Sequence, residues 1–146
     1  HLVIIGRGSL KGRLNRMSAR LGISDRVTIE SGMDFEKIAQ MYRFSQLCVY
    51  PSYYEGQGLI PLEAMSSGIP VVTVNNGPLP EMVDETVGAL FELGSVDSLS
   101  EAIASELSSN ESLNQKGAEG RQRVLDRFTL DGNAERFLEV YRRASS

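Results

Sequence analysis

The sequence alternates short, continuous apolar runs with longer stretches whose apolar residues recur at helical spacing. The apolar runs lie at 1–5, 26–29, 47–50, 70–74 and 89–91, and the helical patterns cover 9–21, 35–44, 59–67, 80–83, 97–108, 111–127 and 130–144. Strands that are apolar throughout are buried on both faces, and such strands belong to parallel sheets covered by helices. We therefore expect an α/β fold, with an open parallel sheet of about five or six strands and helices on both faces.

Individual residues mark where several of these helices should begin and end. Gly22 and Gly68 follow two of the helical patterns, and glycine readily adopts the left-handed backbone that ends a helix. Asp34 precedes the pattern at 35–44, where its carboxylate can accept hydrogen bonds from free amides of the first turn. A further helix should begin near Leu59. These signals give helix boundaries that the structure can test.

The composition is typical of a folded globular domain and excludes several classes of protein. The chain has 146 residues, of which 41% are hydrophobic and 23% are charged, so disorder is not expected. The formal net charge is −4, whereas nucleic-acid-binding proteins usually carry a basic surface. We therefore expect one domain that has no nucleic-acid partner.

The cysteine count indicates a cellular compartment, and the start of the chain indicates whether the sequence is a fragment. Cys48 is the single cysteine, so an internal disulfide cannot form, which favours a reducing compartment and a cytoplasmic location. No apolar run approaches the ~20 residues that span a bilayer. The sequence enters an apolar strand directly at His1, with no initiator methionine, and we expect a fragment of a longer protein.

The segment Pro-Ser-Tyr-Tyr-Glu-Gly-Gln-Gly-Leu-Ile-Pro-Leu-Glu-Ala-Met, at 51–65, holds the densest group of candidate functional residues. Gly56 and Gly58 flank Gln57 immediately before the expected helix, so a ligand can approach the backbone closely. Free amides near Gly58 to Ile60 then form the positive end of a helix dipole. Such a helix end is suited to binding a diphosphate.

Two glutamates flank this glycine-containing loop. Glu63 lies in the first turns of the expected helix and can accept two hydrogen bonds from a ribose diol, while Glu55 is placed for the sugar side of a sugar nucleotide. A plainer interpretation makes Glu55 a solvated loop residue and Glu63 a charge that stabilises the helix N-terminus. The complete segment favours the ligand-binding interpretation.

The segment resembles the donor-site motif of the family-4 (group 1) glycosyltransferases, which have the GT-B fold. The shared features are the proline-serine turn, Glu55-Gly-x-Gly-Leu, and Glu63-Ala-Met after seven intervening residues. The resemblance continues at 4–8, 25–29, 67–72, 77–83 and 88–90, and into a closing helix that ends at Tyr141. It implies that residues 1–146 are the Rossmann-like C-terminal half of a GT-B enzyme, with C-terminal helices from about 97 to 144. The N-terminal acceptor domain is then absent from this chain.

The resemblance also implies a reaction. Residues of this kind bind a nucleoside-diphosphate sugar and transfer a hexosyl group, with retention, to a glycan, lipid or small-molecule acceptor, without a cofactor or metal. One histidine, one cysteine and no clustered carboxylates likewise give no metal site. The acceptor would bind through the N-terminal domain, and the phosphate-binding arginine and lysine of the family lie upstream of His1. We therefore expect this fragment alone to be inactive.

Roles for individual residues follow from the same resemblance. Glu55 would contact the transferred sugar or support its departure, and Glu63 would bind the ribose hydroxyls. The amides of Gly58 and Leu59 would hold the diphosphate, and Gly56 and Gln57 belong to the same donor-binding loop. The loop at Gly32 and Met33 would flank the base. The family often has an aromatic residue where Gln57 stands, so contacts at that position differ.

Two other functions fit parts of the sequence. The first is an isolated nucleotide-binding module without transfer activity. The second is a dinucleotide-binding oxidoreductase domain, suggested by Gly6-Arg7-Gly8. That fingerprint is incomplete, because Lys11 stands where the third glycine belongs.

Several residues have two open interpretations. Arg7 is either a ligand contact or a solvated charge, and Tyr53 and Tyr54 either stack on the ligand or pack at the edge of the sheet. Glu81 either caps a short helix or reaches the donor sugar. The arginines near the C-terminus favour a solvated face, and an alternative is contact with the absent domain or a peripheral contact with an anionic membrane. They are Arg121, Arg123, Arg127, Arg142 and Arg143.

Overall fold

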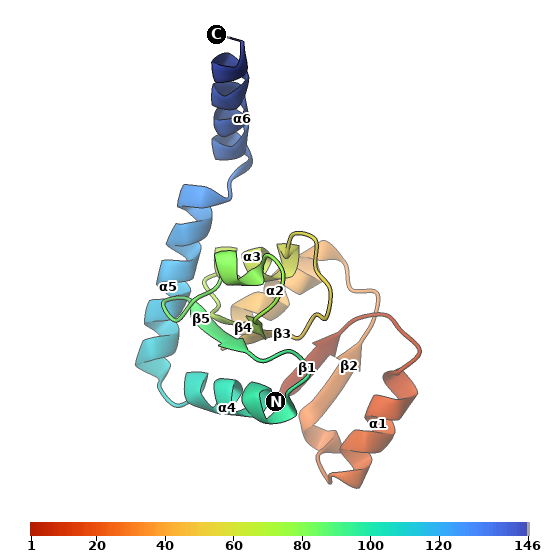
Figure 1. Cartoon of the computed structure of the whole chain (residues 1–146). Helices are drawn as coiled ribbons and strands as arrows, with labels where there is room; N and C mark the ends of the chain where they lie inside the picture. The colour runs from red at the N-terminus through yellow and green to blue at the C-terminus, as the bar shows by residue number, and fades with distance from the viewer. Residues whose placement is uncertain (146) are drawn as a thin grey trace. The chain divides into compact units, whose positions relative to one another are not determined.

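The computed structural model describes residues 1–145, which form two compact units (Figure 1). The first unit covers residues 1–40, and the second begins at Met41. Helix α2 (Phe35–Phe44) starts in the first unit and ends in the second. Each unit contains its own parallel sheet.

The first unit is built around a pair of parallel strands. Strand β1 (Leu2–Ile5) pairs with β2 (Val27–Glu30), in a register that sets Leu2 opposite Val27. Helix α1 (Lys11–Arg20) and the short 3-10 helix η1 (Ser24–Arg26) connect the two strands. Gly22 follows the end of α1 with φ at +68°, the left-handed backbone that its sequence position predicted.

The second unit has three parallel strands in the order β3, β4, β5. They are β3 (Cys48–Tyr50), β4 (Val71–Val74) and β5 (Gly88–Phe91). Its helices are α3 (Leu59–Ser66), the 3-10 helix η2 (Leu79–Glu81), α4 (Val96–Glu106), α5 (Asn110–Arg127) and α6 (Leu130–Ala144).

The hydrophobic core lies around the central strand β4. All four of its residues are buried, although neighbouring side chains on a strand point to opposite faces, so both faces of the sheet are covered. Helix α3 packs on β3 and β4, and α4 packs on β4 and β5 (Figure 1). The other buried core residues are Ala64, Met65, Ile69, Leu79, Met82, Val83, Val87 and Phe91.

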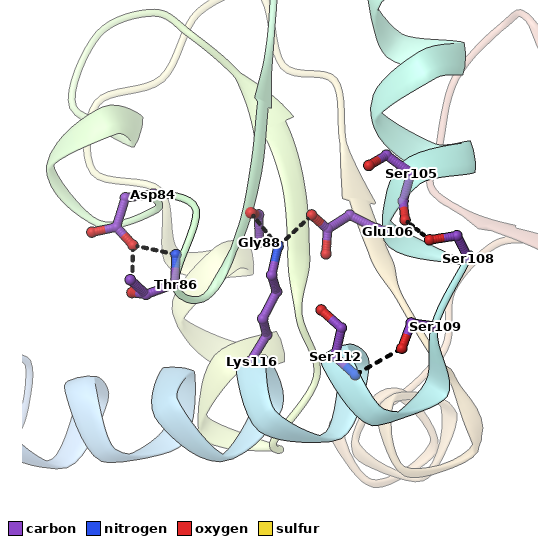
Figure 2. Close-up of polar contacts among 9 residues, drawn as sticks. All are labelled: Asp84, Thr86, Gly88, Ser105, Glu106, Ser108, Ser109, Ser112 and Lys116. Atoms are coloured by element: carbon purple, nitrogen blue, oxygen red, sulfur yellow. Dashed lines mark hydrogen bonds and ion pairs between the residues drawn. The ribbon is translucent and has the colours of Figure 1, made fainter.

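Helix α5 approaches the end of α3 at two glycines. A Cβ atom built on Gly117 would lie 2.1 Å from the carbonyl oxygen of Gly68, so only glycine permits this approach. At the other end of α5, the Ser109 hydroxyl caps the helix by accepting a hydrogen bond from the Ser112 amide at 3.2 Å (Figure 2). The close approach of Gly117 to Gly68 therefore packs α5 against α3.

The expected α/β fold with parallel strands and flanking helices is confirmed. The strands form two sheets, of two and three strands, where the sequence suggested one larger sheet. The expected helix starting near Leu59 begins at that residue, and Asp34 caps α2 by accepting a hydrogen bond from the Lys37 amide at 2.8 Å. The 3-10 helix η1 was not predicted, because a single 3-10 turn has no apolar periodicity.

Candidate functional site

The loop between β3 and α3 depends on the left-handed backbone of Gly58. This residue has φ at +78° and precedes the first residue of α3, Leu59. A Cβ atom built on Gly58 would lie 2.6 Å from Cε of Met82 and 2.9 Å from Cδ2 of Leu79. Gly56, by contrast, has nothing within 4 Å of a built Cβ. Gly58 is therefore required for its left-handed backbone, and a Cβ there would also displace the ends of two side chains, whereas Gly56 leaves open space at the loop.

The N-terminus of α3 has features that favour an anion. No side chain caps this helix end, and its first turn carries no acidic residue. Leu59 and Ile60 are 58% and 40% exposed, so solvent reaches the first turn. Amides at a helix N-terminus carry partial positive charge and attract phosphate groups.

The carboxylate of Glu55 is held by hydrogen bonds at both oxygens. The Tyr50 hydroxyl donates to Oε2, and the amides of Gly56 and Gln57 donate to Oε1 at 3.1 and 3.4 Å. The pKa of Glu55 lies below its ordinary value, chiefly because of the hydrogen bond from Tyr50. The amides of Gly58, Gln57 and Gly56 lower it further. Glu55 is therefore an ionised carboxylate at neutral pH.

Glu63 lies in the second turn of α3, beside a tyrosine and the cysteine. The Tyr42 hydroxyl donates to Oε2 of Glu63 at 3.4 Å. Burial, followed by the charge of Glu63, raises the pKa of the Cys48 thiol to about 11. Burial also raises the pKa of Tyr42, with smaller contributions from Cys48 and Glu63. Both neighbours of Glu63 are thus neutral at physiological pH.

The loop that follows β4 supports the loop that follows β3. The Thr73 hydroxyl donates to the carbonyl oxygen of Tyr50 at 3.0 Å, and the Asn76 side chain donates to that of Tyr53 at 3.2 Å. A Cβ atom built on Gly77 would lie 3.6 Å from the carbonyl oxygen of Glu55. The two loops therefore form one connected structure at the carboxyl ends of neighbouring parallel strands, where ligands of open α/β sheets bind.

Gly32 and Met33, the residues expected to flank a base, lie in the first compact unit, between β2 and α2. Gly32 has φ at +74°, and an Arg7 guanidinium nitrogen is 3.5 Å from the position of a Cβ atom built on Gly32. The Arg7 side chain thus lies beside this loop, and it forms no hydrogen bond or ion pair within residues 1–145.

The structure narrows the alternatives at the other open residues. Tyr54 is 92% exposed, so packing at the sheet edge is wrong for this residue. Tyr53 is 70% exposed and lines a cavity of about 100 Å³ with residues that include Pro51 and Phe91. Glu81 is exposed, and within residues 1–145 no side-chain hydrogen bond caps η2, so of its two interpretations the capping one is wrong.

The expectation that all the C-terminal arginines lie on a solvated face is wrong for Arg123. Only 13% of its side chain is exposed, and its guanidinium forms an ion pair with Asp84 at 3.0 Å. It also donates to the carbonyl oxygen of Met82 at 3.1 Å and to the Thr86 hydroxyl at 2.6 Å. Arg123 therefore anchors the chain after η2 to α5, a role without a sequence signal because the partners lie far apart in the chain.

Residues 1–145 contain no group of three or more histidine, cysteine, aspartate or glutamate side chains arranged to hold a metal ion. None of the helices over these same residues is long and apolar enough to cross a membrane.

Known proteins match this chain in sequence and in structure. Residues 1–123 match the family model described as glycosyl transferases group 1. The MMP alpha-(1→4)-mannosyltransferase of Mycolicibacterium hassiacum is 35% identical over 135 residues, which are 91% of this chain and 33% of that protein.

Two solved structures are similar to this chain. Sucrose-phosphate synthase from Thermosynechococcus elongatus has a TM-score of 0.86 and 32% identity, over 99% of this chain and 39% of that one. The C-terminal domain of a glycosyl transferase group 1 family protein from Francisella tularensis has a TM-score of 0.76 and 25% identity, over 83% of this chain and 63% of that one.

These matches identify the family. The chain belongs to the group 1 glycosyltransferases, and its fold is that of GT-B glycosyltransferase structures. It spans 33% of the length of the mannosyltransferase that it matches.

Proposed function

We propose that this chain binds a nucleoside-diphosphate sugar and forms the donor half of a retaining glycosyltransferase. The whole protein would transfer a hexosyl group to a glycan, lipid or small-molecule acceptor held by an N-terminal domain. Residues 1–146 would make up the donor-binding domain, with the helices from about 97 to 144 at its C-terminal end. The proposed location is the cytoplasm, where the lone Cys48 stays reduced.

The observation that carries this proposal is the loop from Glu55 to Gly58, joined to an uncapped helix that carries Glu63. In the proposed complex, the amides at Gly58 and Leu59 hold the diphosphate, and Glu63 accepts hydrogen bonds from the ribose diol. Gly56 and Gln57 complete the donor-binding loop. The Gly32 and Met33 loop flanks the base.

Glu55 is the proposed catalytic residue. Its carboxylate is ionised and is hydrogen-bonded at both oxygens. In the proposed reaction, this fixed negative charge stabilises the positive charge that develops on the sugar as the diphosphate leaves. Hexosyl transfer is proposed because similar proteins are named as mannosyltransferases. The proposed reaction proceeds without a cofactor or a bound metal, and the cations that face the departing diphosphate come from outside this chain.

The test compares Glu55→Gln with the wild-type residue in the whole enzyme. We expect kcat to fall on the order of 100-fold, the usual cost of removing one electrostatic stabiliser. Affinity for the free nucleoside diphosphate should stay unchanged, because Glu55 contacts the sugar. An equal loss of both would place Glu55 at the nucleotide, and no loss of either would make it a solvated loop residue.

A second experiment separates a transferase half from an independent nucleotide-binding module. The 146-residue chain should not transfer sugar at a meaningful rate, because positioning of donor against acceptor supplies ~7–11 kcal/mol of the barrier reduction. The assay runs this chain beside the whole enzyme with its acceptor. Comparable turnover by the two would contradict the proposed division of the active site.

A further inference from the structure

Tyr50 connects the sheet to the carboxylate of Glu55. Tyr50 is the last residue of β3, where it lies opposite Thr73 in the register of β3 and β4. Its carbonyl oxygen accepts a hydrogen bond from the Thr73 hydroxyl at 3.0 Å, and its own hydroxyl donates to Oε2 of Glu55. The tyrosine is therefore fixed on a regular element, whereas the glutamate lies on a loop.

Glu55 needs such an anchor because its own loop holds the carboxylate through backbone amides alone. The amides of Gly56 and Gln57 both bind Oε1, and Gly56 leaves the space beside the loop open. Hydrogen bonds at Oε1 do not by themselves fix the plane of the carboxylate. The Tyr50 hydroxyl binds the other oxygen and so fixes the plane of the carboxylate. Chemistry at a reacting centre is sensitive to misplacements of about 1 Å.

We propose that Tyr50 is a positioning residue, whose hydroxyl holds the Glu55 carboxylate in the orientation required for sugar transfer. The inference rests on the proposed catalytic role of Glu55. It adds a residue outside the segment from Glu55 to Glu63, on the strand that precedes the loop. Tyr50 does not contact the donor in this account, and it acts through Glu55.

The surroundings of Glu55 make the effect of Tyr50 measurable by pH. From β3, the Tyr50 hydroxyl contacts the carboxylate, and from the loop itself the amides of Gly56, Gln57 and Gly58 do so. The neighbouring loop contributes backbone at Gly77, and no cationic or anionic side chain of residues 1–145 pairs with Glu55. Because the Tyr50 hydrogen bond stabilises the ionised form, its loss raises the pKa of Glu55.

The experiment measures Tyr50→Phe in the whole enzyme, with donor concentration and pH both varied. We expect kcat to fall about 10-fold or more, the effect of losing one hydrogen bond to a charged group. The KM for the donor and the Kd for the nucleoside diphosphate should change less than about twofold, since the hydroxyl does not touch the ligand. The acidic limb of the kcat profile should move to higher pH.

Two further variants complete the test. Tyr141→Phe removes the same hydroxyl from an exposed tyrosine on α6 and should leave kcat and its pH profile unchanged. The double variant Tyr50→Phe with Glu55→Gln should be no slower than Glu55→Gln alone, because residues that act as a unit are not additive.

Four results would overturn the inference. An unchanged kcat with an unmoved acidic limb in Tyr50→Phe would show that Glu55 needs no anchor. Parallel loss of kcat, nucleotide affinity and thermal stability, or additive losses in the double variant, would show that Tyr50 only supports the fold. Tighter donor binding at an unchanged kcat would show that Tyr50 holds Glu55 in a resting position. If Glu55→Gln itself were fully active, the proposed function would fail first, independently of the Tyr50 result.

Discussion

The ammonium group of Lys116 lies 2.6 Å from Oε1 of Glu106 and joins α5 to the last residue of α4 (Figure 2). Lys116 also donates to the carbonyl oxygen of Gly88, the first residue of β5, at 3.3 Å. The second carboxylate oxygen of Glu106 is buried and has no hydrogen-bond partner among residues 1–145. This ion pair therefore links two helices and a strand at the end of the sheet opposite the donor-site loops.

Replacement of Lys116 by methionine should destabilise the protein strongly. The change leaves both oxygens of a carboxylate that is only 5% exposed without a partner. Removal of one member of a buried ion pair costs ~3–5 kcal/mol, and we expect the low end because 20% of the Lys116 side chain is exposed. Urea unfolding of Lys116→Met and the wild-type protein measures the difference.

Lys37→Met provides the matched control for this experiment. Lys37 pairs with Asp34 at 3.2 Å, but the two side chains are 65% and 59% exposed, and surface pairs contribute little. Its free energy of unfolding should change by less than about 0.5 kcal/mol. Equal effects of the two substitutions would show that the Lys116 pair does not stabilise the fold.

The two glycines of the donor loop should respond differently to alanine. Gly58→Ala forces a left-handed backbone on a residue with a Cβ, and that atom would meet Met82 and Leu79. We expect a loss of ~1–3 kcal/mol of folding stability. Gly56→Ala has open space and should leave stability within about 0.5 kcal/mol, while it weakens donor binding by obstructing close approach to the backbone.

Thermal unfolding of both variants, and titration of the whole enzyme with the donor, check this pair of expectations. A Gly58→Ala protein as stable as wild type would contradict the packing argument. Unchanged donor affinity in Gly56→Ala would show that the ligand does not approach this part of the loop.

The sequence predicted the elements of this protein well because its apolar runs and helical spacings are long and regular. It also placed the start of α3 at Leu59 and the caps at Gly22 and Asp34, since these signals are local. It did not find Tyr42 and Tyr50, whose hydroxyls bind the two glutamates. Tyrosines at the end of a helix or strand usually pack at an edge, so nothing in the sequence distinguishes them.

Contacts between segments that are distant in the chain could not be predicted from the sequence either. Arg123 binds Asp84 and Lys116 binds Glu106, and both pairs depend on how α5 packs against the rest of its unit. Arginines and lysines on a helix are solvated more often than buried, so the expected solvated face was wrong for Arg123, and the Lys116 ion pair had no sequence signal. Burial of a charge becomes predictable only after the packing of the helices is known.

The Cys48 thiol should react slowly with alkylating reagents in the folded protein. Its pKa of about 11 lies above the ordinary 9.0, so the thiolate that reacts is about 100-fold scarcer at pH 8 than in the unfolded chain. The same shift should reduce folding stability as pH rises from 9.0 toward 11, because the unfolded state ionises first. Iodoacetamide labelling with and without urea measures the difference, and equal rates would contradict the burial of this thiol.

The most direct test of the donor-binding account is calorimetric titration of the whole enzyme with nucleoside diphosphates, comparing Glu63→Ala with the wild-type residue. Glu119→Ala, an exposed glutamate on α5, serves as the matched control and should bind like wild type. We predict that Glu63→Ala weakens binding by ~1.5–3 kcal/mol, the range for hydrogen bonds that involve a charged group. Unchanged affinity in a folded Glu63→Ala protein would contradict the assignment of this loop and helix as the nucleotide site.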